Sequence, residues 1–189
     1  FMCNCSMALC KKIKMKKKIY IIGFMGTGKS YWGKVWAKNH QMPFMDLDSL
    51  IEEKEKGKVL DIFEQKGEEF FREVEADCLR STLPFDNSII ACGGGAPCSH
   101  NNMEWMNENG LTILLEATPA EVFENIKKET RSRPLLKDKN EGEVIFFIEK
   151  LMNERKSFYD QAQIKMPVKN LTAKSLDIIL QPNLDTHHA

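Results

Sequence analysis

Short apolar runs alternate along this chain with longer segments whose apolar residues recur at the 3.6-residue period of a helix. The apolar runs predict strands at 19–22, 44–48, 88–92, 111–115 and 164–168. The periodic segments predict helices at about 29–41, 49–55, 59–66, 69–81, 101–109, 118–129, 144–159 and 172–180. The first two strands and the helix between them have the outline of a βαβ unit, so the pattern favours an α/β fold.

Directly after the first predicted strand stands Gly23–Ser30, with the sequence G-F-M-G-T-G-K-S. Glycines let consecutive backbone N–H groups turn inward around a polyphosphate, because no Cβ atom blocks the approach. Lys29 adds a cation, Ser30 offers a hydroxyl to Mg²⁺, and the following helix points its positive N-terminus at the same phosphates. A fortuitous glycine-rich turn is the alternative, but the strand before the loop and the helix after it favour a nucleoside triphosphate site.

Two acids, Asp46 and Asp48, close the second predicted strand. Ligands of open α/β sheets bind beyond the carboxyl ends of the strands, and residues two apart in an extended segment face the same side. Both carboxylates are therefore expected to point into the site of the phosphate loop. The alternative is that they cap the helix that follows, Asp48 in particular.

An arginine and a run of glycines add to these candidates. Arg72 lies three residues before Glu75 on a predicted helix, so the two are neighbours on its surface. They form either an ordinary exposed ion pair or a pair in which the glutamate holds the guanidinium for an anionic ligand. Gly93–Gly95 costs backbone entropy at the end of the third strand, which indicates a close approach to the main chain. A tight turn is the alternative, although one or two glycines would suffice for it.

Residues 131–142 form a polar segment in which Arg131 and Arg133 precede several charged and turn-forming residues. On composition alone this segment is either a plain exposed loop or a lid that brings cations over a bound ligand. The residues themselves leave both interpretations open.

Composition and charge narrow the classes of function. The 189 residues suit one domain, and no run approaches the roughly 20 apolar residues of a membrane span. Six of the 27 basic residues and none of the 27 acids fall within 1–18, which leaves 21 basic against 27 acidic groups elsewhere. This mildly acidic body argues against nucleic acid as a partner. The six cysteines lack the C-x-x-C spacing of zinc sites, so free thiols and a cytoplasmic location are expected.

Five spaced motifs together resemble those of the shikimate kinases, over about residues 17–180. They are G-F-M-G-T-G-K-S at 23–30, D-L-D at 46–48, F-R-E-V-E at 71–75, G-G-G at 93–95, and R-P-L-L at 133–136 with the arginine of E-R-K-S-F-Y at 154–159. The resemblance implies a three-layer α/β/α P-loop kinase fold, with a five-stranded parallel sheet in the order 2-3-1-4-5 and a mobile lid at about 131–142. It also implies that ATP, with Mg²⁺, phosphorylates the 3-hydroxyl of shikimate.

The same resemblance implies roles for single residues. The nucleotide would be bound by Gly26, Thr27, Gly28, Lys29, Ser30, Tyr31 and Arg133, and Mg²⁺ by Ser30 and, through water, by Asp46. Shikimate would be bound by Asp48, Arg72, Gly93, Gly94, Gly95 and Arg155. Catalysis would rest on Asp48, Lys29 and Arg133, with Asp48 as the candidate base. If Arg72 and Arg155 lie close to Asp48, they favour its ionised form, so we expect Asp48 chiefly to orient the attacking hydroxyl.

This sequence departs from the family pattern in places. Tyr31 replaces the Ser or Thr that is common after the serine of the loop, and the segment 169–174, where the family usually contacts adenine, has no arginine. Cys92 and Cys98 flank the glycines, where they would make the site sensitive to thiol reagents unless they are inert packing residues.

Other functions compete with this interpretation. Gluconate kinases and nucleoside-monophosphate kinases share the phosphate loop, but the glycine run combined with Asp48 and Arg72 disfavours them. A regulatory module that has lost catalysis would lack an acceptor-site residue, and none is missing. A GTPase is disfavoured because no N-K-x-D motif occurs.

The predicted organisation is a single kinase domain at 17–181. Residues 1–16 are interpreted as an N-terminal extension, disordered or foreign to the natural chain, and 182–189 as a tail. Within the domain the acceptor-binding region is expected at about 47–82. We expect a monomer whose partner is a small-molecule substrate, with neither nucleic acid nor membrane involved.

Overall fold

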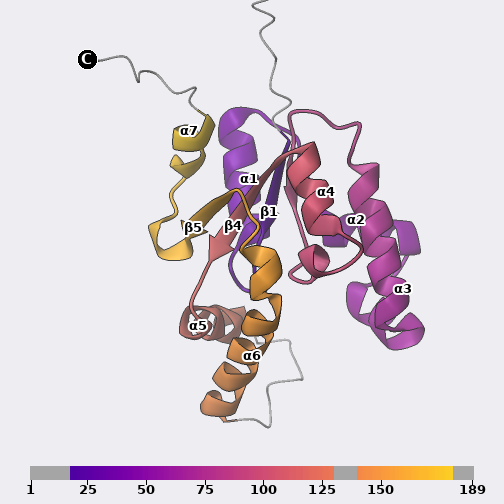
Figure 1. Ribbon diagram of the computed structural model, residues 1–189, viewed down its shortest axis with the longest axis vertical. Coiled ribbons are helices and arrows are strands. Elements are labelled where there is room, and N and C mark those ends of the chain that lie inside the picture. Colours follow the sequence, from indigo (N-terminus) through magenta and orange to yellow (C-terminus); the bar gives the residue numbers. More distant parts are fainter. Residues whose placement is uncertain (1–17, 130–139, 181–189) are drawn as a thin grey trace, which may run out of the picture.

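One parallel sheet lies at the centre of the structure (Figure 1), a computed structural model that describes residues 18–129 and 140–180. Its strands are β1 (Ile19–Ile22), β2 (Phe44–Asp46), β3 (Ile89–Ala91), β4 (Leu111–Glu116) and β5 (Ile164–Pro167). All neighbouring strands pair in parallel, in the order β2-β3-β1-β4-β5. The predicted order 2-3-1-4-5 is confirmed.

Helices cover both faces of this sheet, which gives the expected three layers. The helices are α1 (Lys29–His40), α2 (Leu47–Glu55), α3 (Val59–Ser81), α4 (Asn102–Asn109), α5 (Pro119–Glu129), α6 (Glu141–Tyr159) and α7 (Ser175–Leu180), with short 3₁₀ turns η1 (Ala96–Cys98) and η4 (Val168–Asn170). Side chains of α1 and α7 form one apolar cluster with the sheet, and side chains of α2, α3, α4, α5 and α6 form the other. The fold is therefore doubly wound around β1.

The strand β1 is the most enclosed element of the sheet. All four of its side chains are fully buried. Tyr20 and Ile22 pack in the larger cluster, while Ile19 and Ile21 pack against Trp36 of α1 in the other. Burying an aliphatic side chain of this size contributes roughly 1.5–3 kcal/mol. The loop that follows β1 thus starts from a firmly held strand.

The second strand is shorter than the sequence predicts. It ends at Asp46, and the chain turns at once into α2, so that Asp48 lies in the first helical turn. Asp46 caps the helix, because its Oδ1 accepts a hydrogen bond of 3.1 Å from the backbone N–H of Asp48. The expectation that an extended segment orients both acids was wrong. The alternative, a helix cap, is what the structure shows, except that the capping residue is Asp46 and not Asp48.

Two helices also differ from the prediction in their extent. The segments predicted at 59–66 and 69–81 form the single element α3, in which only Gly67 leaves the helical conformation, with φ 84° and ψ 171°. The helix α6 begins three residues early because Asn140 forms a capping box with Glu143. The spacing N-x-x-E could have indicated this start.

Within the described parts of the chain, no helix combines the length and the apolar character needed to cross a membrane.

Candidate active site

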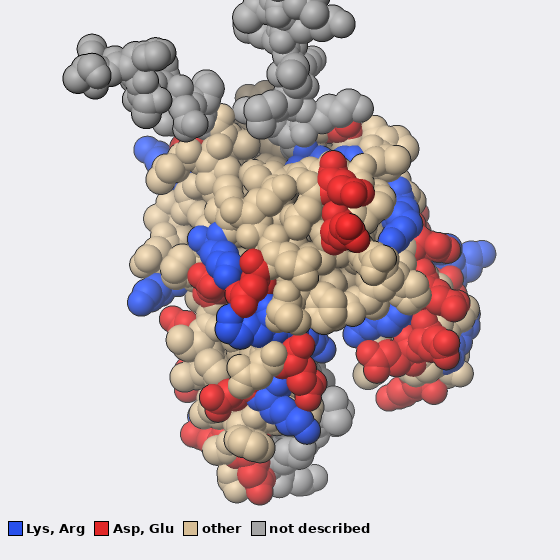
Figure 2. All heavy atoms as spheres, in the orientation of Figure 1, with Lys and Arg blue, Asp and Glu red and all other residues tan. Residues whose placement is uncertain are grey.

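The phosphate loop joins β1 to α1 at the carboxyl end of the sheet, where Figure 2 shows the molecule hollowed between the lobe of α2 and α3 and the lobe of α5 and α6. Gly26 and Gly28 have φ of 74° and 80°, a region that favours glycine. The carbonyl of Phe24 accepts hydrogen bonds of 2.8 Å from both Thr27 Oγ1 and Lys29 Nζ. The loop therefore has a closed internal framework, and the lysine lies against it.

Lys29 has an unusual environment for an ammonium group. Burial lowers its pKa to about 8, and the nearby carboxylate of Asp48 opposes the shift without cancelling it. Arg155 adds a smaller effect in the same direction as burial. An anionic ligand beside this lysine would restore its preference for the charged form.

Ser30 and Asp46 form a pair of oxygen donors at the start of α1. Ser30 Oγ donates to Asp46 Oδ2 at 2.5 Å. Among residues 18–129 and 140–180, no group of three or more His, Cys, Asp or Glu side chains is arranged to hold a metal ion. One hydroxyl and one carboxylate still fit Mg²⁺, because this ion retains water and binds substrate phosphates through few protein oxygens.

A cavity of about 670 Å³ adjoins the loop on the side of α5. It is lined by Gly26, Thr27, Gly28, Tyr31, Trp32, Ala120, Glu121, Glu124, Asn125, Val168 and Lys169. The rings of Tyr31 and Trp32 meet edge to face with centroids 5.1 Å apart. Asn125 Nδ2 donates to the carbonyl of Gly26 at 2.9 Å and so ties α5 to the loop. No local pattern in the sequence marks Asn125.

Each glycine of Gly93–Gly95 lies against a site side chain. A Cβ atom added in turn to the three residues would lie 2.7, 3.4 and 2.7 Å from a side-chain atom of a charged residue. Those atoms belong, in order, to Glu75, Arg155 and Arg72. None of the three glycines has a positive φ. The chain does turn here, since the N–H of Ala96 donates to the carbonyl of Gly93 at 3.1 Å, but it is the close approach of charged side chains that requires glycine at 93 and 95.

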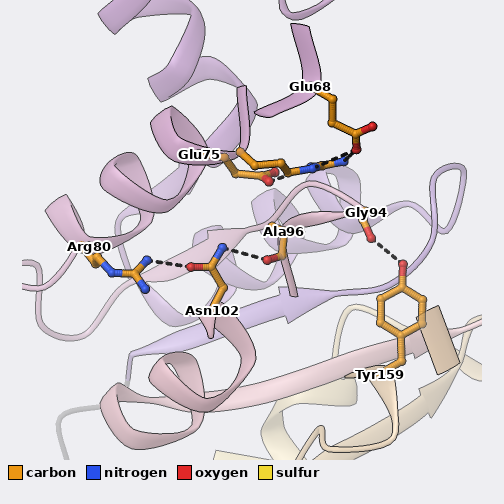
Figure 3. Close-up of polar contacts among 8 residues, drawn as sticks. Glu68, Glu75, Arg80, Gly94, Ala96, Asn102 and Tyr159 are labelled. Carbon is orange, nitrogen blue, oxygen red and sulfur yellow. Dashed lines mark hydrogen bonds and ion pairs between the residues drawn. The ribbon is translucent and has the colours of Figure 1, made fainter. Parts of the chain in front are cut away.

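Arg72 of α3 is held by two carboxylates from its own helix (Figure 3). Its Nη1 donates to Glu75 Oε2 at 2.7 Å and its Nη2 donates to Glu68 Oε1 at 3.2 Å. Glu75 is 1% exposed, so the pair is not the ordinary exposed ion pair considered above. Burial raises the pKa of Glu75, and Arg72 opposes that rise. The guanidinium is thus fixed beside the backbone of Gly95.

Asp48 lies between the phosphate loop and Arg72. Burial by the surrounding protein raises its pKa, the negative charge of Asp46 adds to the rise, and Lys29 and Arg72 oppose it. Arg72 favours the ionised form of Asp48, as expected, but burial and the charge of Asp46 outweigh it, so the net shift of the pKa is upward. A raised pKa makes Asp48 a better proton acceptor than expected.

Arg155 approaches the same turn from α6. Its guanidinium carbon lies 5.3 Å from the ring centroid of Phe24, and its Nη1 lies 3.4 Å from the position of a Cβ on Gly94. Tyr159, one helical turn further, donates from its hydroxyl to the carbonyl of Gly94 at 2.6 Å (Figure 3). The structure therefore brings Asp48, Arg72, Arg155 and the three glycines together next to the phosphate loop.

Comparisons with known proteins identify the family and the fold of this chain. Residues 25–181 match the family model described as shikimate kinase. The shikimate kinase of Bacteroides thetaiotaomicron is 40% identical over 146 residues, which is 77% of this chain and 83% of that protein. The chain belongs to the shikimate kinase family. The predicted family and fold are confirmed.

Solved shikimate kinases have the same fold. The crystal structure from Bacteroides thetaiotaomicron superposes with a TM-score of 0.82 at 35% identity, covering 87% of this chain and 98% of that one. The Acinetobacter baumannii enzyme, solved in complex with shikimate, gives a TM-score of 0.77 at 28% identity over 88% of this chain and 92% of its own.

The sequence analysis did not identify the side chains that support the turn at Gly93–Gly95. Asn102 is fully buried and donates from Nδ2 to the carbonyl of Ala96 at 2.8 Å. Arg80 in turn donates to Asn102 Oδ1 at 2.6 Å (Figure 3). No local pattern marks Asn102, because its partners lie outside its own helix, six residues away at Ala96 and 22 residues away at Arg80. Glu68, by contrast, could have been found from its spacing of four residues before Arg72.

Arg133 lies outside the described residues, as does most of the predicted lid. Of the segment 131–142, only Asn140–Gly142 is described, and these residues cap and begin α6. Lys127 near the end of α5 pairs with Glu141 at the start of α6. The lid and the role of Arg133 stay predictions.

Proposed function

We propose that this member of the shikimate kinase family transfers the γ-phosphoryl group of ATP to the 3-hydroxyl of shikimate. The observation that carries the proposal is the glycine turn, where Asp48 and two arginines meet directly beside the phosphate loop. A small carboxylate with several hydroxyls requires fixed cations and short-range polar contacts, and Arg72, Arg155 and the backbone of Gly93–Gly95 supply both.

In this proposal the donor side acts through charge and position. Lys29 and the backbone of the loop hold the phosphates of ATP, and Ser30 and Asp46 hold Mg²⁺, which neutralises phosphate charge when bound. Phosphoryl transfer needs positioning and charge neutralisation more than covalent participation by the protein. Arg133 is the proposed cation that reaches the phosphates from the lid.

Asp48 is the proposed acceptor of the hydroxyl proton. The 3-hydroxyl oxygen forms a bond to the γ-phosphorus while the bond from that phosphorus to ADP breaks. The hydroxyl proton passes to the Asp48 carboxylate, whose pKa is already raised by burial. Asp48 also orients the hydroxyl, so replacing it by Asn should remove most of the turnover and leave ATP binding intact.

We further propose a monomeric, cytoplasmic enzyme. Every described residue of the site comes from one chain, so the proposed chemistry needs no second subunit. Cys78, Cys92 and Cys98 are free thiols, and free thiols suit a reducing compartment. Sedimentation analysis measures the oligomeric state, and we expect the mass of a single chain.

The function is tested by measuring ADP release with shikimate, gluconate, AMP and CMP as parallel acceptors at equal concentration. We expect turnover with shikimate at least about 100-fold above the other three, because a site that pairs charged groups with one ligand leaves them unpaired with another. A higher rate with gluconate or a nucleotide would favour the competing kinases named above.

A further inference from the structure

Phe24 faces both halves of the proposed site, although it occupies an unspecified position of the loop motif. Its backbone carbonyl accepts hydrogen bonds from Thr27 and Lys29, on the side of the phosphates. Its ring lies against the guanidinium of Arg155, on the side of the acceptor. The side chain is only 2% exposed, so this ring has a fixed place in the structure.

Arg155 is held differently from Arg72. Within the part of the chain that the structure describes, no carboxylate lies within ion-pair distance of Arg155, whereas Arg72 has both Glu68 and Glu75. The groups in contact with Arg155 include the ring of Phe24, the phenol of Tyr159 and the backbone of Gly94. The carboxylate of Glu75 acts on it only from beyond ion-pair distance. An aromatic face attracts a cation without neutralising it. Arg155 is therefore positioned while its charge stays available to an anionic ligand.

The packing around Phe24 makes the arrangement sensitive to the shape of this side chain. A cavity of about 200 Å³ adjoins Phe24, and Leu114, Met152 and Tyr159 are among the residues that line it. A smaller residue at position 24 would enlarge this space, because surrounding structure collapses only in part around a truncated side chain. Arg155 would then lose the surface that fixes its guanidinium.

We propose that Phe24 is a positioning residue of the acceptor site, whose ring holds Arg155 in place for the carboxylate of the acceptor. One residue of the phosphate loop thereby contacts both halves of the proposed site, through its carbonyl on one side and its ring on the other. This inference rests on the proposed function, since it takes Arg155 as a ligand of shikimate.

The test compares Phe24→Leu and Phe24→Met with Phe24→Tyr. Shikimate binding is measured by calorimetry without nucleotide, and the KM values for shikimate and ATP are measured by ADP release. Both aliphatic variants should weaken shikimate binding about three- to tenfold, the range expected for a lost cation–π contact, and leave the KM for ATP within about twofold. Phe24→Tyr keeps an aromatic face, so it should bind shikimate nearly as the wild type does.

Phe123→Leu is the matched control. Phe123 is also buried, at 7% exposure, and its ring also contacts a cation, with Lys127 Nζ 5.5 Å from the centroid. This cation is not part of the acceptor site, so the control should change neither constant. Phe24→Met guards against a folding defect in Phe24→Leu, because methionine restores most of the volume without the aromatic face.

Two results would overturn the inference: unchanged shikimate binding in both aliphatic variants, or an equal loss in Phe123→Leu. Wild-type protein that neither binds nor phosphorylates shikimate would refute the proposed function itself. Wild-type turnover combined with unaffected Phe24 variants would refute only the role of Phe24.

Discussion

The phosphate loop presents the backbone of one continuous stretch, Gly23–Ser30, whereas the proposed acceptor side draws single side chains from α2, α3 and α6 around the turn after β3. The loop is held internally, by hydrogen bonds to the carbonyl of Phe24. The acceptor side is held by contacts between elements distant in sequence, such as Tyr159 with Gly94. Loss of a phosphate-binding group of the loop should therefore lower turnover whichever substrate is varied, while loss of an acceptor-side group should change the affinity for shikimate alone.

The largest effect is expected from Lys29→Met. Removal of this cation should lower kcat/KM about 10²- to 10³-fold whichever substrate is varied, because the charge acts on the phosphates being transferred. The exposed Lys38→Met on the same helix is the control and should retain wild-type rates. Near-normal turnover of Lys29→Met in the ADP-release assay would contradict the assignment of the loop.

Arg72→Lys and Arg155→Lys should affect the binding of shikimate without affecting the binding of ATP. Each replacement keeps the charge but loses the planar fork that matches a carboxylate, so the KM for shikimate should rise about tenfold or more. The KM for ATP should stay within about twofold. If the two KM values rose together, the arginines would not belong to a separate acceptor side.

Gly95→Ala tests whether close approach explains the glycine run. The added Cβ atom would lie 2.7 Å from the Arg72 guanidinium carbon, so we expect the KM for shikimate to rise about fivefold to tenfold as that group is displaced. Gly57→Ala is the matched control, because the nearest atom to its new Cβ lies 3.7 Å away. Equal effects of the two replacements would point to general strain.

Glu75→Gln should have a smaller effect than loss of Arg72 itself. The amide keeps the shape but not the charge, and Glu68 still accepts from Arg72. We expect roughly a threefold to fivefold rise in the KM for shikimate, since one charge-assisted hydrogen bond becomes a neutral one. A wild-type value in the same steady-state assay would show that Glu68 alone positions the guanidinium.

The smallest predicted effect is on the reactivity of Cys98, and it tests whether the site is sensitive to thiol reagents. Burial raises the pKa of this thiol, and Arg155 and Arg72 oppose the rise. Since the thiolate is the reactive form, alkylation by iodoacetamide at pH 7.5 should be slower than that of a free cysteine and should speed up as the pH increases. Mass spectrometry of the modified peptide measures this rate. Fast alkylation at neutral pH would contradict the account.

The same contrast explains how much could be predicted from the sequence. The loop is contiguous, so the strand before it and the helix after it were predicted correctly, while the nucleotide-binding roles of its residues stay predictions. The acceptor residues were found only as separate motifs, and their roles came from the family resemblance. That each glycine faces a different charged side chain depends on how α3 and α6 pack beside β3, which no local pattern records.

Two local errors have a clear physical reason. Asp48 was expected on a strand because the apolar run continues through Leu47. The strand ends earlier, at Asp46, because the side chain of Asp46 caps the helix that begins at Leu47. The effect of Arg72 on the pKa of Asp48 has the expected sign, but the larger effect of burial depends on the folded structure and no local pattern indicates it. Asn102 and Asn125 were missed because polar residues that bind distant carbonyl groups carry no periodic signal.

A competition experiment determines whether the acceptor side binds shikimate in preference to other acceptors, so that shikimate receives the phosphoryl group of the ATP bound at the phosphate loop. The protein is incubated with ATP, Mg²⁺ and an equimolar mixture of shikimate, gluconate, AMP and CMP, and the phosphorylated products are followed by ³¹P NMR. We expect a single new phosphomonoester resonance, that of shikimate 3-phosphate, which increases at the same rate as the resonances of ADP. Phosphorylation of another acceptor first, or ADP formed without any new phosphate ester, would contradict it.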